Sequence, residues 1–305
     1  MLSVVLEHLR GCSAPALLAA VRRARGLAVQ HGRSDAAEAL AAHLIVELSM
    51  EGNSRYRCGD YKVAVSNYEE AIHLCEDRAR SGAASMGDGR SAECAVGREA
   101  PRDAVCRGLV FDGVHEFVMG SSSAGFAVQR QNLVRLRYNL ARALHRLDRW
   151  SDARDQATDV IALDRTYANA YTLRAQAAMA AFDWEAAEAD WERLLAMSAS
   201  GSCCIGDEPV SEETLSLWQR RRDECNRQAT MGHYEVLELP RLSSLESVRR
   251  AYRDLARKWH PDKNQHQSKD CQERGARKFT RLREAFEAIG DEASKRAYDS
   301  MLLLC

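Results

Sequence analysis

Residues 248–264 read VRRAYRDLARKWHPDKN, and this run predicts a helix with two unlike sides. Apolar residues recur at helical spacing and should form a buried stripe, namely Val248, Ala251, Leu255 and Trp259. Arginine and lysine crowd the other side, which should face solvent. The helix must end before Pro261, because proline disfavours a helical conformation in the residue before it. His260-Pro261-Asp262 should therefore be displayed where the chain turns.

The segment before this run predicts a helix start and a second, shorter helix. Ser243 and Glu246 have the spacing of a capping box, so we expect the long helix to begin there and to run through Trp259. Residues 234–239 read YEVLEL and predict a short apolar helix that Pro240 stops. The domain should thus open with a short helix and a longer, basic one.

The segment after the turn predicts two more helices. Residues 273–289 carry apolar side chains spaced 3, 4 and 3 apart, at Phe279, Leu282, Phe286 and Ile289. Gly290 is expected to end this helix, and Asp291 to cap a fourth one over residues 292–303. Two long antiparallel helices joined by a loop would then present the His-Pro-Asp turn.

These residues carry a resemblance to a known family. The YEVL segment, the run quoted above, the F-x-x-L-x-E-A-F-E pattern from Phe279 and the KRAYD segment at 295–299 resemble the J domain of the DnaJ family over residues 231–300. We assign residues 231–303 to this domain. The resemblance implies that the chain docks ATP-bound Hsp70 at the junction of its nucleotide-binding domain, linker and substrate domain. It also implies faster ATP hydrolysis by Hsp70, which traps the client.

The resemblance assigns roles by position. His260, Pro261 and Asp262 would be the essential turn, and the docking face would comprise Tyr252, Arg249, Arg253 and Lys258. Asp254 stands at a position that is often basic in the family, which is expected to weaken docking. No catalytic residue, metal ligand or cofactor is expected, because the sequence holds no phosphate-binding loop, H-E-x-x-H motif or nucleophile elbow.

Upstream, the sequence repeats a pattern of small and aromatic residues. Gly52 precedes an Ala64, Tyr68, Ala71 series, and Ala153 and Ala187 lie 34 residues apart with tryptophans nearby. Small residues at fixed points let two helices pack closely, as in tetratricopeptide (TPR) hairpins of about 34 residues. We assign the first TPR hairpin to 35–78, and the second and third to 131–201. The fold class is therefore all-α: a TPR array followed by a C-terminal four-helix J domain.

Three further segments complete the organisation. Residues 79–130 are rich in Ser, Gly, Ala and Arg and are interpreted as a disordered insertion. Ser211, followed by two glutamates, should cap a helix over 211–229 that closes the repeat stack. Residues 1–34 are interpreted as an N-terminal helical segment, because Leu2, Val5, Leu6 and Leu9 recur at helical spacing.

The repeat groove has two candidate binding residues, Asn53 and Asn139. They match the asparagines of the TPR carboxylate clamp, which binds the acidic tails of Hsp70 and Hsp90. Ser49, Asn169 and Leu173 occupy the positions of the expected cations, and Arg142 and Arg174 should point elsewhere. Without those cations the clamp loses its charge-assisted hydrogen bonds. A client or scaffold protein is therefore the favoured ligand, and tail binding the alternative.

Composition narrows the remaining classes of function. The formal net charge is −1, so nothing global points to nucleic acid or an acidic membrane, and no run of apolar residues is long enough for a membrane span. The ten cysteines contain no C-x-x-C pair and are interpreted as reduced thiols. We expect the cytoplasm or nucleus. The alternative is a mitochondrial presequence, because residues 1–33 hold five arginines and one acidic side chain.

Overall fold

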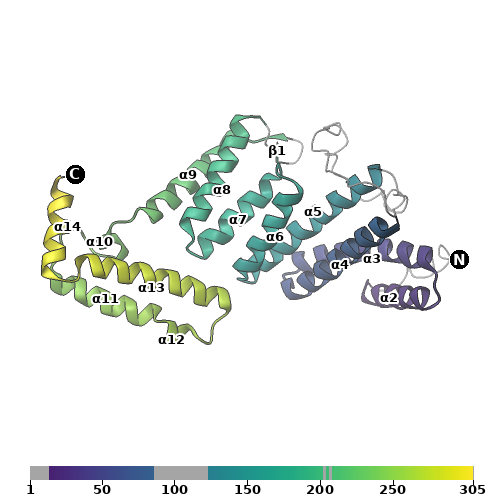
Figure 1. Ribbon diagram of the computed structural model, residues 1–305, viewed down its shortest axis with the longest axis horizontal. Helices are drawn as coiled ribbons and strands as arrows, with labels where there is room; N and C mark the ends of the chain where they lie inside the picture. Colours follow the sequence, from purple (N-terminus) through teal and green to yellow (C-terminus); the bar gives the residue numbers. More distant parts are fainter. Residues whose placement is uncertain (1–13, 86–122, 202–203, 206–207, 305) are drawn as a thin grey trace. The chain divides into compact units, whose positions relative to one another are not determined.

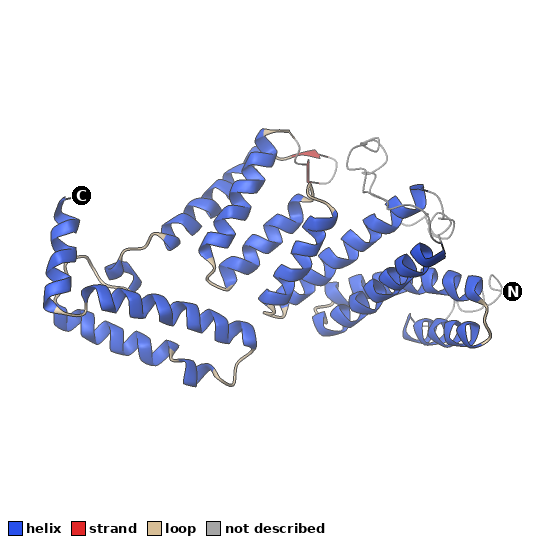
Figure 2. Ribbon diagram, in the orientation of Figure 1, coloured by secondary structure: helices blue, strands red, loops and turns tan. Residues whose placement is uncertain are grey.

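The computed structural model describes residues 14–85, 123–201, 204–205 and 208–304. The described chain is helical apart from two strands of two residues each, β1 (Cys204–Ile205) and β2 (Glu208–Pro209), which confirms the all-α class (Figures 1 and 2). It divides into two compact units: residues 1–147, 156–167 and 204–208 form the first, and residues 148–155, 168–203 and 209–305 the second.

The first unit is built around the helical hairpin of α3 (Ser34–Arg57) and α4 (Tyr61–Ser85). The two helices approach closely because Gly52 lies against the ring of Tyr68, where an added Cβ would come within 2.7 Å of Cε1. Ala64 and Ala71 on α4 are fully buried in the same interface. The small-and-aromatic pattern predicted from the sequence therefore makes the contact that a TPR hairpin requires.

Helix α5 (Ser123–Arg146) packs on α4 and is followed by α6 (Trp150–Leu163), the other helix of the expected second hairpin. The guanidinium of Arg137 ties three helices together, since it contacts Glu76 of α4 at 2.5 Å and Asp159 of α6 at 2.5 Å. Helices α4 and α5 both extend into the range 79–130 that was interpreted as an insertion. Residues 86–122 of that range lie outside the described part of the chain.

At the other end of this unit, α2 (Ala14–Gln30) packs on α3 through buried Leu18 and Val21. Arg22 of α2 also forms a bidentate ion pair with Glu70 of α4, at 2.7 and 2.5 Å. Residues 1–13, which carry the leucine pattern of the expected N-terminal segment, lie outside the described residues.

The second unit contains residues 148–155 and the third hairpin, α7 (Ala168–Ala180) and α8 (Trp184–Ala199). Arg174 of α7 binds buried Asp190 of α8 with two hydrogen bonds, of 2.8 and 2.6 Å. Helix α9 (Glu212–Ala229) follows, capped by Ser211 as expected, and its buried Trp218 and Cys225 face α8. It therefore covers the apolar side of the last repeat.

The J domain comprises α10 (His233–Val236), α11 (Leu245–Trp259), α12 (Pro261–Asn264), α13 (Lys269–Ile289) and α14 (Glu292–Leu304). Its core is a cluster of buried side chains from α10, α11 and α13 and from Leu237, which follows α10. The cluster includes Tyr234, Val248, Leu282 and Ile289. Asp291 caps α14 as expected, since its Oδ1 accepts from the backbone N–H groups of Ala293 and Ser294.

Two helix starts in this domain differ from the sequence expectation. The cap of α11 is Ser244, whose Oγ accepts from Ser247 N–H, and not Ser243, whose hydroxyl donates instead to the Pro240 carbonyl. Helix α13 starts at Lys269, before the expected 273, because Ser268 provides a cap that accepts from Cys271 N–H. The turn itself contains α12, a short helix that sequence reasoning treated as loop.

Candidate functional site

His260-Pro261-Asp262 lies at the junction of α11 and α12. Pro261 is the first residue of α12, where its fixed φ and missing N–H suit a helix start. The Nδ1 atom of His260 accepts a hydrogen bond from the backbone N–H of Asp262 at 3.2 Å, and its ring meets the edge of Phe279 at 5.8 Å. The His260 and Asp262 side chains are 46% and 75% exposed. The turn is thus ordered by its own residues while its polar groups stay accessible.

The basic face of α11 is split between exposed and engaged residues. Arg253 and Lys258 are exposed, beside Arg250 and Arg257, which the resemblance did not single out. Arg249 is tied to the end of α13, because its Nε donates to the Gly290 carbonyl at 3.2 Å. Tyr252 stacks on Phe286 at 4.1 Å and is half-buried.

The four residues expected to form the docking face therefore differ in what they offer a partner. Arg253 and Lys258 present their charge to solvent, and Arg249 is also exposed but donates to the end of α13. Tyr252 is half-buried and packs on α13. Asp254 lies 3.9 Å from Arg257 and offsets part of the positive charge. Exposed charges of this kind steer an acidic partner and are screened by salt. Directed hydrogen bonds from His260 and Asp262 would then have to supply specificity.

The two asparagines of the repeat groove meet in the first unit. The Oδ1 atom of Asn53 accepts from the Tyr68 hydroxyl at 2.8 Å and from Asn139 Nδ2 at 3.1 Å. These two hydrogen bonds link α3, α4 and α5, and both are accepted by the side-chain carbonyl of Asn53. The asparagines therefore take part in packing between helices of the repeats, which is the other role that residues at these positions can have.

Arg142 packs against aromatic rings of the same unit. Its guanidinium lies 4.7 Å above the ring of Tyr56 and 5.8 Å from that of Tyr138. Tyr56 follows Asn53 by three residues, and Arg142 follows Asn139 by three, so all four lie on neighbouring turns of α3 and α5. Arg174, by contrast, is engaged by Asp190 as described above.

Two other kinds of site are not found among the described residues. Within them, no group of three or more His, Cys, Asp or Glu side chains is placed to hold a metal ion. No helix in these ranges has the length and apolar character needed to cross a membrane. Burial raises the pKa of the Cys75 thiol to about 12 and that of the Cys225 thiol to about 11.

Comparison with known proteins gives matches to the J domain and to the longer chain. A family model described as "DnaJ domain" matches residues 232–299. Human DnaJ homolog subfamily B member 3 is 42% identical over 69 residues, which is 23% of this chain and 45% of that protein. The chain is thus similar to that protein over the J domain alone.

Two relatives match upstream as well. DnaJ protein P58IPK homolog A of Oryza sativa subsp. japonica is 25% identical over 255 residues, 83% of this chain and 49% of the relative. DnaJ homolog subfamily C member 7 homolog of Dictyostelium discoideum is 27% identical over 161 residues, 53% of this chain and 28% of the relative. The chain matches half or less of the length of these relatives. Residues 232–299 are a DnaJ domain, and helical hairpins of the TPR kind precede it in the chain.

Proposed function

We propose that the chain is an Hsp70 co-chaperone whose J domain docks ATP-bound Hsp70 and accelerates its ATP hydrolysis. One observation carries this proposal: the ordered, accessible His260-Pro261-Asp262 turn stands directly after the exposed basic face of α11. A cationic face attracts an acidic partner over a distance of about 10 Å, and the turn then offers directed hydrogen bonds at contact. The chain itself would hydrolyse no ATP.

The repeat array would bind a client or partner polypeptide. Helical repeats stack into extended surfaces that suit such ligands. The aromatic and cationic side chains of Tyr56, Tyr138 and Arg142 give the first unit a surface of mixed character, and Arg142 adds a donor for peptide oxygens. We further place the protein in the cytoplasm or nucleus. The packing of α2 onto α3 supports the interpretation of the N-terminal segment as part of the repeat array.

Single-turnover ATP hydrolysis by a cytosolic Hsp70 tests the proposal. We expect the wild-type chain to accelerate hydrolysis and His260→Gln to abolish the acceleration. His266→Gln is the matched control, since His266 is an exposed histidine six residues later in the same connection. It should behave like the wild type. Hydrolysis by the chain alone would contradict the proposal, as would undiminished stimulation by folded His260→Gln.

The alternative is a TPR scaffold that binds Hsp70 or Hsp90 tails with an inactive or auxiliary J domain. It is favoured by the Asn53–Asn139 pair and by Arg142, which lies over the ring of Tyr56 one helical turn from Asn53. That alternative predicts no stimulation by either the wild type or His260→Gln, with binding to Hsp70 retained when its tail is present. Repeating the assay with a mitochondrial Hsp70 separates a scaffold from a chain whose cognate Hsp70 is in another compartment.

A further inference from the structure

One side of α13 carries polar residues that the J-domain core does not use. Asp270, Arg274, Arg277 and Arg281 are spaced 4, 3 and 4 residues apart, so they lie in one row along the helix. We refer to these four as the α13 stripe. It runs beside the apolar stripe of Leu282 and Ile289, which faces the core. All four belong to the second unit, together with the residues that they contact.

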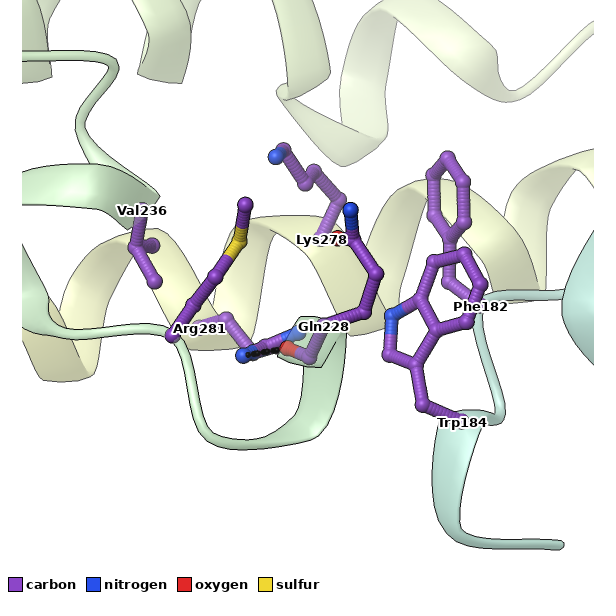
Figure 3. Close-up of a pocket in the computed structure, with 7 residues that line it drawn as sticks. Phe182, Trp184, Gln228, Val236, Lys278 and Arg281 are labelled. Atoms are coloured by element: carbon purple, nitrogen blue, oxygen red, sulfur yellow. Dashed lines mark hydrogen bonds between the residues drawn. The ribbon is translucent and has the colours of Figure 1, made fainter. Parts of the chain in front are cut away.

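Three residues of the α13 stripe bind backbone groups at the ends of other helices. Asp270, which is buried, accepts from the backbone N–H of Ser151 in the first turn of α6 at 2.8 Å. Arg277 donates to the carbonyl of Ala181, just after α7, at 3.2 Å. Arg281 donates to the carbonyl of Gln228 at the end of α9 at 2.6 Å, as Figure 3 shows.

The charges match the helix ends in all three cases. The first N–H groups and last carbonyls of a helix lack partners within the helix, and they carry partial positive and negative charge respectively. The carboxylate of Asp270 meets the amino end of α6, whereas the two arginines meet the carboxyl ends of α7 and α9. Arg277 also lies 3.3 Å from Asp183, which caps α8. These contacts therefore act as caps supplied by the J domain to helices of the repeats and of α9.

Phe182 provides independent evidence for the contact between α13 and the α7–α8 turn. Its φ is +60°, a left-handed conformation that is strained for a bulky residue. The corresponding turn of the first hairpin uses Gly59, and that of the second uses Asp148, both also with positive φ. Only the third hairpin places an aromatic ring there. That ring lies 4.3 Å from the guanidinium of Arg274 and 6.1 Å from the ring of Trp259.

We propose that the α13 stripe is a latch that holds the J domain on the first turn of α6, the α7–α8 turn and the end of α9. The latch fixes the orientation of the J domain relative to the last hairpin. Its hydrogen bonds come from α13, while Arg250, Arg253, Arg257 and Lys258 on the basic face of α11 stay exposed. A partner docked on α11 would then bind a J domain whose orientation relative to the last hairpin is fixed. Without the latch, the J domain could rotate about the connection at Met231-Gly232.

Hydrogen exchange of the Ser151 amide in the full chain tests the central contact. Asp270→Ala removes the acceptor and should accelerate this exchange about tenfold or more, because a lost hydrogen bond to a charged group exposes the amide to water. Asp270→Asn keeps an oxygen in place and should show a smaller increase. Arg283→Ala removes an exposed arginine from another side of α13 and should leave Ser151 unchanged. Equal exchange in the wild type and Asp270→Ala would overturn the proposal.

Nitrogen-15 relaxation of the full chain tests the latch as a whole. J-domain amides of the wild type should share the correlation time of the α7–α9 amides. The double variant Arg277→Glu, Arg281→Glu should shorten the correlation time of the J domain, while a dispersed spectrum shows that the domain remains folded. The control variant Arg283→Glu should leave the correlation time of the J domain unchanged. A short correlation time for the J domain of the wild type would overturn the proposal.

The same relaxation measurement tests Phe182 against a matched residue. Phe182→Gly and Asp148→Gly both relieve a left-handed turn, but only the first removes a ring that contacts α13. Release of the J domain is expected in Phe182→Gly alone, and release in both or neither would count against a role for the ring. These readouts contain no Hsp70, so they are independent of the proposed co-chaperone activity.

Discussion

His260 and Asp262 are joined by a hydrogen bond in which the backbone N–H of Asp262 donates to the imidazole Nδ1 at 3.2 Å. His260 therefore caps α12 as well as presenting a ring to solvent. These two roles are separable by substitution, because asparagine is a good helix cap but has no imidazole.

His260→Asn should keep α12 intact and still lose stimulation of Hsp70, whereas His260→Ala should lose both. The loss of a cap costs about 1 kcal/mol, so faster hydrogen exchange of the Asp262 and Lys263 amides in His260→Ala should report it. Single-turnover hydrolysis measures the second role. Stimulation retained by His260→Asn would show that capping is all that His260 contributes.

His233 should make J-domain stability depend on pH. Burial against Tyr298 lowers the pKa of His233 from its usual 6.5, and the charge of Glu284 only partly opposes this. The unfolded chain then binds the proton more readily than the folded one. The contribution is fully present above pH 6.5 and is lost as pH falls through the range below it.

The measurement compares urea unfolding of the full chain at about pH 7.5 and about pH 5.5. His233→Gln cannot titrate, so it should lose less stability on acidification than the wild type. His266→Gln removes an exposed histidine instead and should follow the wild type. Identical losses in the wild type and His233→Gln would rule out His233 as the cause.

Gly52→Ala should destabilise the first hairpin. The new methyl group would approach Tyr68 Cε1 to 2.7 Å, and Tyr68 is fully buried, so the ring has little room to move. Overpacking of this kind costs about 1–3 kcal/mol. The loss should appear as a lower unfolding free energy in denaturant titrations.

Gly26→Ala is the matched control for this substitution. Gly26 lies inside α2, and an added Cβ would meet nothing within 4 Å. Alanine favours a helix over glycine by about 1 kcal/mol, so this variant should be slightly more stable than the wild type. Similar destabilisation by both substitutions would mean that the close approach of Gly52 and Tyr68 does not hold in solution.

An acidic peptide with a free C-terminal carboxylate should bind the repeat groove no more tightly than the same peptide with a C-terminal amide. Asn53 Oδ1 already accepts hydrogen bonds from Tyr68 and Asn139. Two positions where the clamp would need cations are occupied by Ser49 and Leu173. Fluorescence anisotropy with the full chain, up to high micromolar concentration, makes the comparison. A clear preference for the carboxylate that Arg142→Ala removes would support tail binding instead.

The sequence was sufficient for features that rest on local chemistry or on periodic spacing. Ser211 and Asp291 cap helices as expected, because each places an oxygen before a helical run. The hairpins followed from buried alanines at repeated positions. The start of α11 shows where this reasoning fails: Ser243 and Ser244 are both suitable caps, and a hydrogen bond from Ser243 to the Pro240 carbonyl decides between them.

Features that join distant parts of the chain could not be predicted. Tyr252 and Arg249 were placed on the docking face from their positions on α11, yet Phe286 and Gly290 of the following helix and its end determine where they point. The hydrogen bond from Arg277 to the Ala181 carbonyl joins residues 96 positions apart, so local sequence carries no signal of it. Such pairs become visible only once the helices are positioned.

The hydrogen bond between Asn53 and Asn139 connects residues 86 positions apart, and both belong to helices already held by α4. The register of the first two hairpins is therefore set by contacts among α3, α4 and α5 rather than by the length of chain that joins α4 to α5. Any change to that connection that leaves these contacts intact should consequently leave the register of the two hairpins unchanged.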